Sequence, residues 1–538
     1  MVLDANVLSH LKSDAIGDAQ LSQLLLSEFG TYLTSPAVPH MDPQAKTVFS
    51  EVMPERYQRG SNELKLMILR AYRVLLRDTD NIGYLMTTNI PYFIISAAGL
   101  NEEGKAVDNF DVVMEGCKCM VNGTRQSEEL RRAMISEDCA YVGNLAERII
   151  TSCLQIFNPT VEQPIFVHHD VGTIIELLYL DLRVIFAITA LSTEARTKVS
   201  PQITFFIGVI HKFALQLTTP SPHNSMKQEC ITELLKVLFN VFIGHVQVDQ
   251  SVEKLCAQEC SQLIKSNYLP NSIKYDAVNV LAHISSQFTS LCPQVTEESV
   301  TDDMIVYEGM DVTFLKCLLD LLELRLDELS APEMDLLITY FGILTVLCKE
   351  NKAARRYCRQ RILPPLRAND VEHPPEEGMA FRNKIIRIMT KSVGTLKRIV
   401  AEFLFVLCKR SVSRMIKYCG FGHSAGLLAD YGFLSKIGEV RRASDSEDSE
   451  TEDYKQVEPS VNPVTGYVQG DRRNPFDYMT EEQKEYEAVK LANTMDKLLD
   501  SGVFMPGRIG PDGRPQAVSH VNELVKDVHI ESDHSDED

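Results

Sequence analysis

Four cationic side chains recur on one face of a short helical pattern and could bind an anion. Lys352, Arg355, Arg356 and Arg359 fall at i, i+3, i+4 and i+7, a spacing that places them on one side of an α-helix. No acidic residue at i+4 neutralises them, so the cluster favours an arriving anion. Phosphate fits best, because a guanidinium group can donate two parallel hydrogen bonds to it. The simpler alternative is a solvated basic face with Glu350 and counter-ions nearby.

A source for that anion lies in an acidic segment further along the chain. Ser444 and Ser449 each have a glutamate three residues later, the spacing that an acidophilic kinase of the casein kinase two type prefers. Each phosphate would add about −1.5 to −2 charges. We expect both phosphoserines to bind the four cations, unless the segment is only a solvated acidic linker. Two further receiving residues are expected in the next repeat, Lys397 and Arg398.

A second set of polar side chains could bind a peptide. Arg73 and Arg77 flank the apolar face of the helical pattern from Glu63 to Leu76, either as a basic groove wall or as ordinary solvated arginines. Asn122 and Asn240 end two copies of an apolar hexamer, the position from which an armadillo repeat projects an Asn into its concave groove. An Asn amide both donates and accepts hydrogen bonds, so it can bind a peptide backbone without reading side chains. In the repeat between the hexamers that end at Asn240 and Lys349, this position is His283.

The elements that carry these residues are helices that need cover on more than one side. Val400, Phe403, Leu404 and Leu407 recur at i, i+3, i+4 and i+7, and most residues between them are also apolar. Such a helix must be packed between neighbours. Helices stacked in this way build an α-solenoid.

The repeat itself is visible in the sequence. Val237 and Val280 lie 43 residues apart, inside the roughly 40 to 47 residues expected for armadillo or HEAT repeats. We therefore predict an all-α fold, with an armadillo/HEAT-repeat α-solenoid over residues 1–437. Three closely similar hexamers mark the repeat: Leu235–Asn240, Leu344–Lys349 and Leu404–Lys409.

Composition narrows the classes of partner. The net charge of −20 argues against nucleic acid or an acidic membrane surface as the main partner. No continuous apolar run reaches the roughly 18 to 20 residues of a bilayer span. The 13 cysteines lie mostly in apolar helical runs and are expected to be reduced core thiols. Cys117 and Cys119 lack the second pair or histidines of a zinc site, so we expect neither a metal nor a cofactor.

The sequence shows no candidate catalytic site for an enzyme, because its histidines and acidic residues do not cluster into a catalytic triad or a set of metal ligands. The glycine-rich segment Tyr418–Gly426 resembles a nucleotide loop only superficially, since no strand precedes it and its spacing fits neither a dinucleotide fingerprint nor a P-loop. We interpret its glycines as turn and close-packing residues between two short helices.

The composition changes after Gly438. We expect an acidic, phosphorylatable linker over residues 438–475, kept extended after the acidic run by Pro459, Pro463 and Gly466. Residues 476–538 would form a C-terminal helical arm and an acidic tail. Thr480 and Gln483 predict a capping box at the start of that helix. The solenoid or a partner must cover its narrow apolar stripe, which comprises Leu491, Met495, Leu498 and Leu499.

Several motifs together resemble the synembryn family, the "resistance to inhibitors of cholinesterase" proteins. Weaker matches in the same order, including Asp181-Leu182-Arg183, extend the resemblance over nearly the whole chain, although the first 60 residues match poorly. The strongest motifs are Leu363–Arg367, Arg382–Lys384, Ala401–Cys408, Ile416–Tyr418, Ala425–Ala429, Asn462–Gly466 and Met479–Glu485.

The resemblance implies a cytoplasmic solenoid that acts on heterotrimeric G-protein α subunits, as a folding chaperone and as a guanine-nucleotide exchange factor. It implies that the C-terminal helix of the α subunit lies in the concave groove, where Arg73, Arg77 and Asn122 stand at matching positions, and that the C-terminal arm grips the switch region. Such a protein needs no catalytic acid or base.

Two hypotheses of different classes follow. The first is the exchange factor and chaperone, expected to be a cytoplasmic monomer, with recruitment to the cell cortex left open. The second is a passive armadillo-type adaptor that binds peptides and leaves nucleotide exchange unchanged.

Overall fold

The protein consists of two compact units, Met1–Gln287 and Phe288–Asp538. The computed structural model describes residues 8, 16–79, 81–100, 109–158, 160, 169–244, 246–434, 451–469, 478–500, 507–512 and 514–517. Within these ranges nearly all regular structure is helical, and the strands form only three antiparallel two-stranded hairpins. The prediction of an all-α helical-repeat fold is confirmed.

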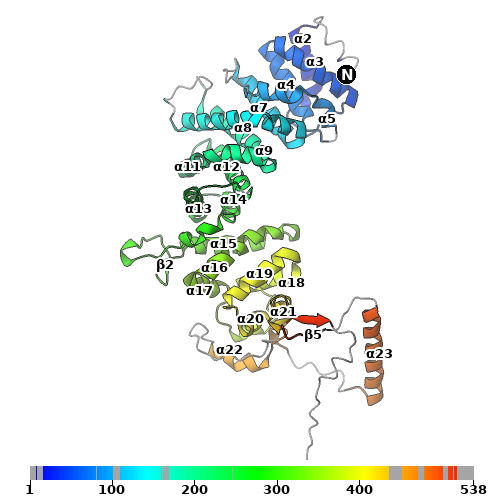
Figure 1. Ribbon diagram of the computed structural model, residues 1–538, viewed down its shortest axis with the longest axis vertical. Helices are drawn as coiled ribbons and strands as arrows, with labels where there is room; N and C mark the ends of the chain where they lie inside the picture. The colour runs from blue at the N-terminus through cyan, green and yellow to red at the C-terminus, as the bar shows by residue number, and fades with distance from the viewer. Residues whose placement is uncertain are drawn as a thin grey trace, which may run out of the picture. The chain divides into compact units, whose positions relative to one another are not determined.

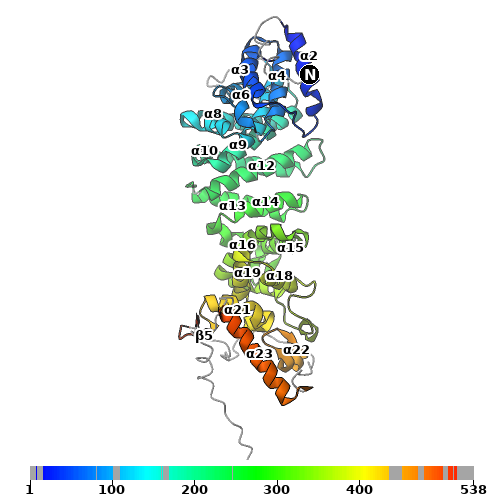
Figure 2. The same ribbon diagram turned by 90° about the vertical axis from the view of Figure 1, so that its right-hand side faces the viewer.

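Helices of the first unit follow one another as pairs and triplets packed side by side (Figure 1, Figure 2). The helices are α2 (Asp18–Phe29), α3 (Pro43–Arg59), α4 (Asn62–Leu75), α5 (Ile82–Leu85), α6 (Ile90–Ala97), α7 (Phe110–Gln126), α8 (Glu128–Phe157), α9 (Val171–Leu191), α10 (Thr193–Val199), α11 (Ile203–Gln216), α12 (Asn224–Ile243), α13 (Gln250–Lys265) and α14 (Asn271–Leu281). Short 3-10 turns, η1 (Gly30–Tyr32) and η2 (Ser200–Gln202), extend α2 and α10.

The helix α9 shows why this stack forms. Its 21 residues are apolar on more than one side, and it packs against α7 and α8 on one side and α12 on the other. Side-chain caps mark the sharp turns between helices: the Ser127 hydroxyl accepts a hydrogen bond from Leu130 N at 3.2 Å, and the Ser192 hydroxyl accepts one from Ala195 N at 3.1 Å. Because of these caps, a single residue separates α7 from α8, and a single residue separates α9 from α10.

A buried ion pair joins four helices of the first unit. The guanidinium of Arg148 on α8 donates to both carboxylate oxygens of Asp181 on α9, at 2.8 and 2.7 Å. The same guanidinium donates to the carbonyl of Ala98, which ends α6, and to the sulfur of Cys117 on α7 at 3.3 Å. Burial raises the pKa of the Cys117 thiol to about 12, so it remains neutral beside the pair. A buried pair with this many hydrogen bonds fixes which helix faces meet.

The second unit continues the helical pattern and adds the hairpins. Its elements are η3 (Ser285–Leu291, which starts in the first unit), η4 (Glu297–Ser299), β1 (Val306–Tyr307), β2 (Met310–Asp311), α15 (Thr313–Glu328), η5 (Ala331–Leu337), α16 (Ile338–Glu350), α17 (Lys352–Ile362), η6 (Ala368–Val371), α18 (Phe381–Lys391), α19 (Gly394–Leu407), α20 (Val412–Cys419), α21 (Phe421–Asp430), α22 (Glu452–Val457), η8 (Glu458–Ser460), β3 (Val461–Asn462), β4 (Tyr467–Val468), α23 (Glu481–Asp500), β5 (Gly507–Ile509) and β6 (Pro515–Ala517).

The helix predicted to need cover on all sides is α19, and it has that cover. It packs against α16, α17, α18 and α21, and eight of its fourteen residues are buried. The η5–α16 stretch, Ala331–Glu350, is long and apolar enough to cross a membrane. It is not a continuous apolar run, because it includes Glu333 and Asp335, and α16 packs here in the core of the second unit against α17 and α19.

Residues 451–469 are not extended, so this part of the linker prediction is wrong. They form α22, η8 and the β3–β4 hairpin, in which Val461 pairs with Val468. Phe421 N and Gly422 N donate to the hairpin carbonyls of Pro463 and Val464 at 2.8 and 2.9 Å.

Gly420 makes that docking possible. Its φ is +77°, and a Cβ atom there would lie 3.0 Å from the Thr465 carbonyl carbon. The interpretation of these glycines as turn and close-packing residues is therefore confirmed for Gly420. None of the 13 cysteines forms a disulfide bond, and the described residues contain no group of His, Cys, Asp and Glu that could hold a metal ion.

Candidate functional site

A pocket of about 440 Å³ opens on the first unit beside the C-terminal ends of α4 and α7. Two residues predicted to bind a partner, Arg77 and Asn122, line it. The other lining residues are Leu33, Thr34, Ser35, Pro36, Leu76, Arg125 and Gln126. Helix C-termini attract cations through the helix dipole, which agrees with the two arginines here.

Arg77 holds the wall of this pocket in place. Its guanidinium donates to the carbonyls of Tyr32 and Ser35 at 2.9 and 2.6 Å, which ties the turn after η1 to α4. Partial burial, together with the nearby Arg73 guanidinium, lowers the pKa of Arg77. Arg77 therefore carries a structural role that the sequence did not reveal.

Arg73 is tied into the fold by side chain and backbone. Its Nη1 lies 3.4 Å from the Glu115 carboxylate on α7. Its carbonyl oxygen accepts a hydrogen bond from the Asn122 amide at 2.9 Å. A charge reversal at Arg73 would therefore disturb the packing of α4 against α7 as well as any partner contact.

The two predicted asparagines end the same helical pattern, Glu at i, Lys at i+3 and Asn at i+7, in which Glu and Lys form an ion pair. The Asn122 amide donates to the Arg73 carbonyl of α4, and the Asn240 amide donates to the Phe186 carbonyl of α9 at 3.1 Å. These amides therefore tie successive repeats together. The residues are Glu115, Lys118 and Asn122 on α7, and Glu233, Lys236 and Asn240 on α12.

The two copies differ in exposure. Asn240 is only 5% exposed and also donates to the Thr189 hydroxyl at 3.0 Å, so its amide hydrogens are used inside the fold. Asn122 is partly exposed and lines the pocket. A direct contact of Asn240 with a partner stays a prediction. At the next position, His283 makes an edge contact with the Phe239 ring instead.

Arg125 is a pocket residue that the sequence interpretation missed. It is exposed on the last turn of α7, lines the pocket, and its guanidinium has no hydrogen bond or ion pair with any described residue. The signal was available, because Arg125 lies three residues after Asn122 and so shares its helix face.

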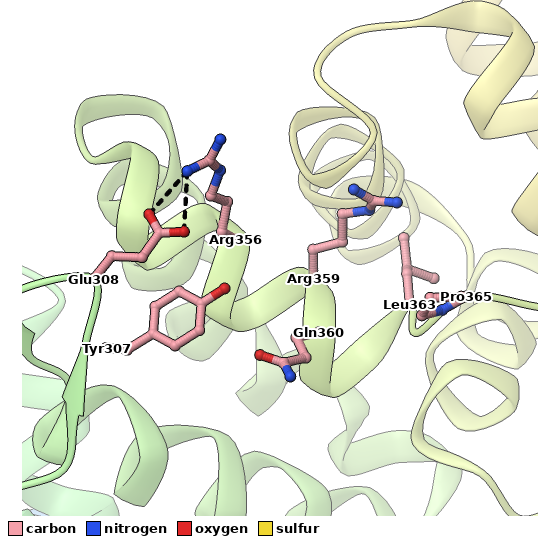
Figure 3. Close-up of a pocket in the computed structure, with 7 residues that line it drawn as sticks. All are labelled: Tyr307, Glu308, Arg356, Arg359, Gln360, Leu363 and Pro365. Carbon is pink, nitrogen blue, oxygen red and sulfur yellow. Dashed lines mark hydrogen bonds and ion pairs between the residues drawn. The ribbon is translucent and has the colours of Figure 1, made fainter. Parts of the chain in front are cut away.

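The basic face on α17 is partly neutralised, which corrects the expectation of four unpaired cations. Nη1 of Arg356 lies 3.0 Å from each carboxylate oxygen of Glu308, at the tip of the β1–β2 hairpin (Figure 3). Arg359 is 8% exposed and donates to the Tyr418 hydroxyl at 3.4 Å. Lys352 and Arg355 form no ion pair with a described residue.

Arg356 and Arg359 line a pocket of about 490 Å³ between the hairpin and the loop after α17. Tyr307, Glu308, Gln360, Leu363 and Pro365 complete the lining. Lys397 and Arg398 are exposed on α19. Ser444 and Ser449 lie outside the described residues.

The helix α23 begins with the predicted capping box. Thr480 N donates to the Gln483 side chain at 3.1 Å, and Gln483 N donates to the Thr480 hydroxyl at 3.3 Å. Leu491 is 62% exposed and Leu498 is 40% exposed, so the described residues cover these two side chains only in part. The side chains of Met495 and Leu499 lie outside the described ones.

Substituting the two asparagines should separate their roles. Asn240→Ala leaves a buried carbonyl and hydroxyl without their donor, so we expect a loss of about 1 to 3 kcal/mol in the free energy of unfolding. Asn122→Ala removes one bond at a partly exposed site where water can substitute, so the loss should be roughly 0.5 to 1.5 kcal/mol. Urea unfolding combined with amide hydrogen exchange of α7 and α12 measures both. Equal losses would contradict this difference.

Comparisons with known proteins agree over most of the chain. The family model for "Guanine nucleotide exchange factor synembryn" (Ric8) matches residues 68–514. "Chaperone ric-8" of Caenorhabditis elegans is 32% identical over 530 residues, covering 91% of each chain. "Chaperone Ric-8A" of Danio rerio is 31% identical and covers 88% of each chain, and that of Bos taurus is 31% identical and covers 84% of each.

Among solved structures, Kap121p bound to RanGTP aligns over 81% of this chain and 41% of that chain, at 11% identity and a TM-score of 0.21. A score this low carries no argument. The family match rests on sequence, and it spans Arg77, Asn122 and Arg125 of the first pocket, the α17 face and α23. This protein belongs to the synembryn family of guanine nucleotide exchange factors.

Proposed function

We propose that this protein is a chaperone and guanine nucleotide exchange factor for heterotrimeric G-protein α subunits. The family match over residues 68–514 carries the proposal, and the chaperone names of the relatives support it. Exchange needs no covalent chemistry. A protein that binds the nucleotide-free conformation more tightly than the GDP-bound one shifts the population towards nucleotide release.

The C-terminal helix of the α subunit is the segment that best fits the pocket on the first unit. The C-terminal end of a helix carries partial negative charge, and a chain terminus adds a carboxylate. Arg125 offers a guanidinium without a partner among the described residues, beside Arg77 and the Asn122 amide. Binding there would withdraw the helix from its own domain and loosen the nucleotide site.

The exposed leucines of α23 supply a second contact. Leu491 and Leu498 need apolar cover that the described residues do not give them fully. We assign Met495 to the same contact from its place in the helical period, and the switch region of the α subunit is the proposed occupant. Two separate contacts would hold an open α subunit more firmly than either alone.

GDP release from a purified α subunit tests this function. The wild-type chain should accelerate release, whereas a passive adaptor would leave the rate unchanged. Arg125→Glu should weaken binding of the α subunit about ten- to a hundredfold, because a charge-assisted contact is lost. The matched control is Arg132→Glu, since Arg132 is exposed on α8, outside the pocket. Unchanged binding by Arg125→Glu would contradict the pocket assignment.

We also propose that phosphorylation of Ser444 and Ser449, by a kinase of the casein kinase two type, regulates this activity through the α17 face. The proposal is supported by the contacts that anchor the chain directly after these serines. The Thr451 hydroxyl donates to the Leu366 carbonyl, Ala368 N donates to Asp453 at 3.2 Å, and Tyr454 is buried. Leu366 directly follows Pro365, which lines the Arg356 and Arg359 pocket.

Chain length then limits the reach of each phosphate. Ser449 lies two positions before Thr451, a span of about 7 Å when extended, and Ser444 lies seven positions before it, a span of about 25 Å. Phosphorylated Ser449 is thus the better candidate for the pocket, and phosphorylated Ser444 for the more exposed cations Lys352 and Arg355. Docking would fix the start of the C-terminal arm and lower the entropy cost of α-subunit binding.

Phosphorylated and unphosphorylated proteins should differ in GDP-release activity, with the phosphorylated form faster. Arg355→Ala combined with Arg356→Ala should abolish most of the difference, because about one to three charge-assisted hydrogen bonds per phosphate are removed. Lys274→Ala, at a cation in the first unit, is the control. Equal stimulation in wild type and the double variant would separate the phosphates from this face.

A further inference from the structure

The geometry of the β1–β2 hairpin points to a second role for Glu308: we propose that its carboxylate is a built-in competitor for Arg356, which prevents the acidic segment from docking until that segment is phosphorylated. The inference rests on the phosphate docking proposed above and adds the residue that makes docking depend on phosphate. Figure 3 shows the carboxylate directed at Arg356 across the mouth of the pocket.

Glu308 occupies a turn position that a glutamate rarely takes. The strands pair Val306 with Asp311 and Tyr307 with Met310, which leaves Glu308 and Gly309 as the two turn residues. Their φ angles are +48° and +76°. Such a turn favours Asn, Asp or Gly at its first position, because a longer side chain is strained in the left-handed region. The contact between the Glu308 carboxylate and Arg356 offsets this backbone strain.

The hairpin is fixed in place by its neighbours. Val295 N donates to the Gly309 carbonyl at 2.9 Å, and Asp311 N donates to the Pro293 carbonyl at 3.0 Å. The Tyr307 ring makes an edge contact with the ring of Tyr357, next to Arg356 on α17, at 5.5 Å between centroids. The Glu308 carboxylate is therefore preorganised, and an incoming anion must compete with a partner that loses little entropy on pairing.

Competition of this kind sets the affinity that an anion needs in order to displace Glu308 from Arg356. The acidic segment carries many carboxylates of its own, among them Asp445, Glu447 and Asp448. Exchanging one carboxylate for another at Arg356 gains no charge. A phosphate brings about −1.5 to −2 charges and three acceptor oxygens, which can bind Arg356 and its neighbours together. Competition from Glu308 lowers the affinity of Arg356 for a carboxylate and for a phosphate alike. Only the phosphate still binds tightly enough to dock the segment.

The pocket supports this arrangement because it holds a second cation that Glu308 does not use. Arg359 lines the same cavity and is held by the Tyr418 hydroxyl and ring, with 6.0 Å from its guanidinium carbon to the ring centroid. A phosphate that displaces Glu308 from Arg356 would enter the cavity that Arg359 also lines. A single carboxylate has fewer oxygens with which to satisfy both.

The test removes the Glu308 carboxylate in the full chain by two substitutions. Glu308→Gln keeps the side-chain size, and Glu308→Gly suits the positive φ of the turn, so at least one variant should keep the hairpin folded. Glu297→Gln is the matched control, because Glu297 is exposed in η4 and removes the same charge away from the pocket. The probe is a peptide with the sequence of residues 441–453, phosphorylated on both serines, and its unphosphorylated form.

Both Glu308 variants should bind the phosphorylated peptide about fivefold more tightly than wild type does, the factor expected when a partly exposed ion pair no longer competes. The unphosphorylated protein with either substitution should also release GDP from the α subunit faster than the unphosphorylated wild type. Unchanged peptide affinity and unchanged release in both variants would overturn the role of Glu308. If wild type binds neither peptide, the phosphate docking itself is wrong, and this inference falls with it.

Discussion

Helices that are apolar on more than one side are stable only between two neighbours, and this constraint underlies both units. The helix α9 shares its faces with α7, α8 and α12, and α19 is enclosed by α16, α17, α18 and α21. Polar groups then decide how the stacked helices register. The Arg148–Asp181 pair, together with the Ala98 carbonyl, specifies one arrangement of α6, α8 and α9. Breaking such a pair would leave a buried charge without compensation.

The same stacking places the candidate binding groups. The Asn122 amide ties α7 to a carbonyl of α4, and the Asn240 amide ties α12 to a carbonyl of α9. Because α4 and α7 end side by side, Arg77 and Arg125 meet at one pocket. In the second unit, α17 follows directly after α16, its Arg356 pairs with Glu308 of a hairpin from before α15, and the loop after α17 is contacted by the chain after the acidic segment. The candidate binding side chains thus lie near helix ends and at a hairpin turn.

Periodicity predicted much of this from the sequence. The repeated hexamers and the all-round apolar helix at 400–407 indicated a stacked helical fold, and the Thr480 and Gln483 pair located the start of α23. Both signals are local, since they depend on residues three or four apart. Gly420 was also interpreted correctly as a turn and close-packing residue between two short helices, whereas Gly422 and Gly426 lie inside α21.

Contacts between distant residues could not be derived in this way. Glu308 neutralises Arg356 from 48 positions away, and nothing in the local pattern of α17 indicates it. The docking of residues 451–469 depends on a surface made by α20, α21 and the loop after α17, so the prolines in that segment suggested an extended chain instead. Arg77 similarly joined the pocket wall through carbonyls of the turn after η1.

The central claim is that the pocket on the first unit and the exposed face of α23 together hold a nucleotide-free α subunit. Amide hydrogen exchange of the full chain, with and without a nucleotide-free α subunit, tests it most directly. We expect slower exchange in residues 33–36, in the last turn of α7 and along α23, with α13 unchanged. Protection confined to other helices, or none in α7 and α23, would contradict the account.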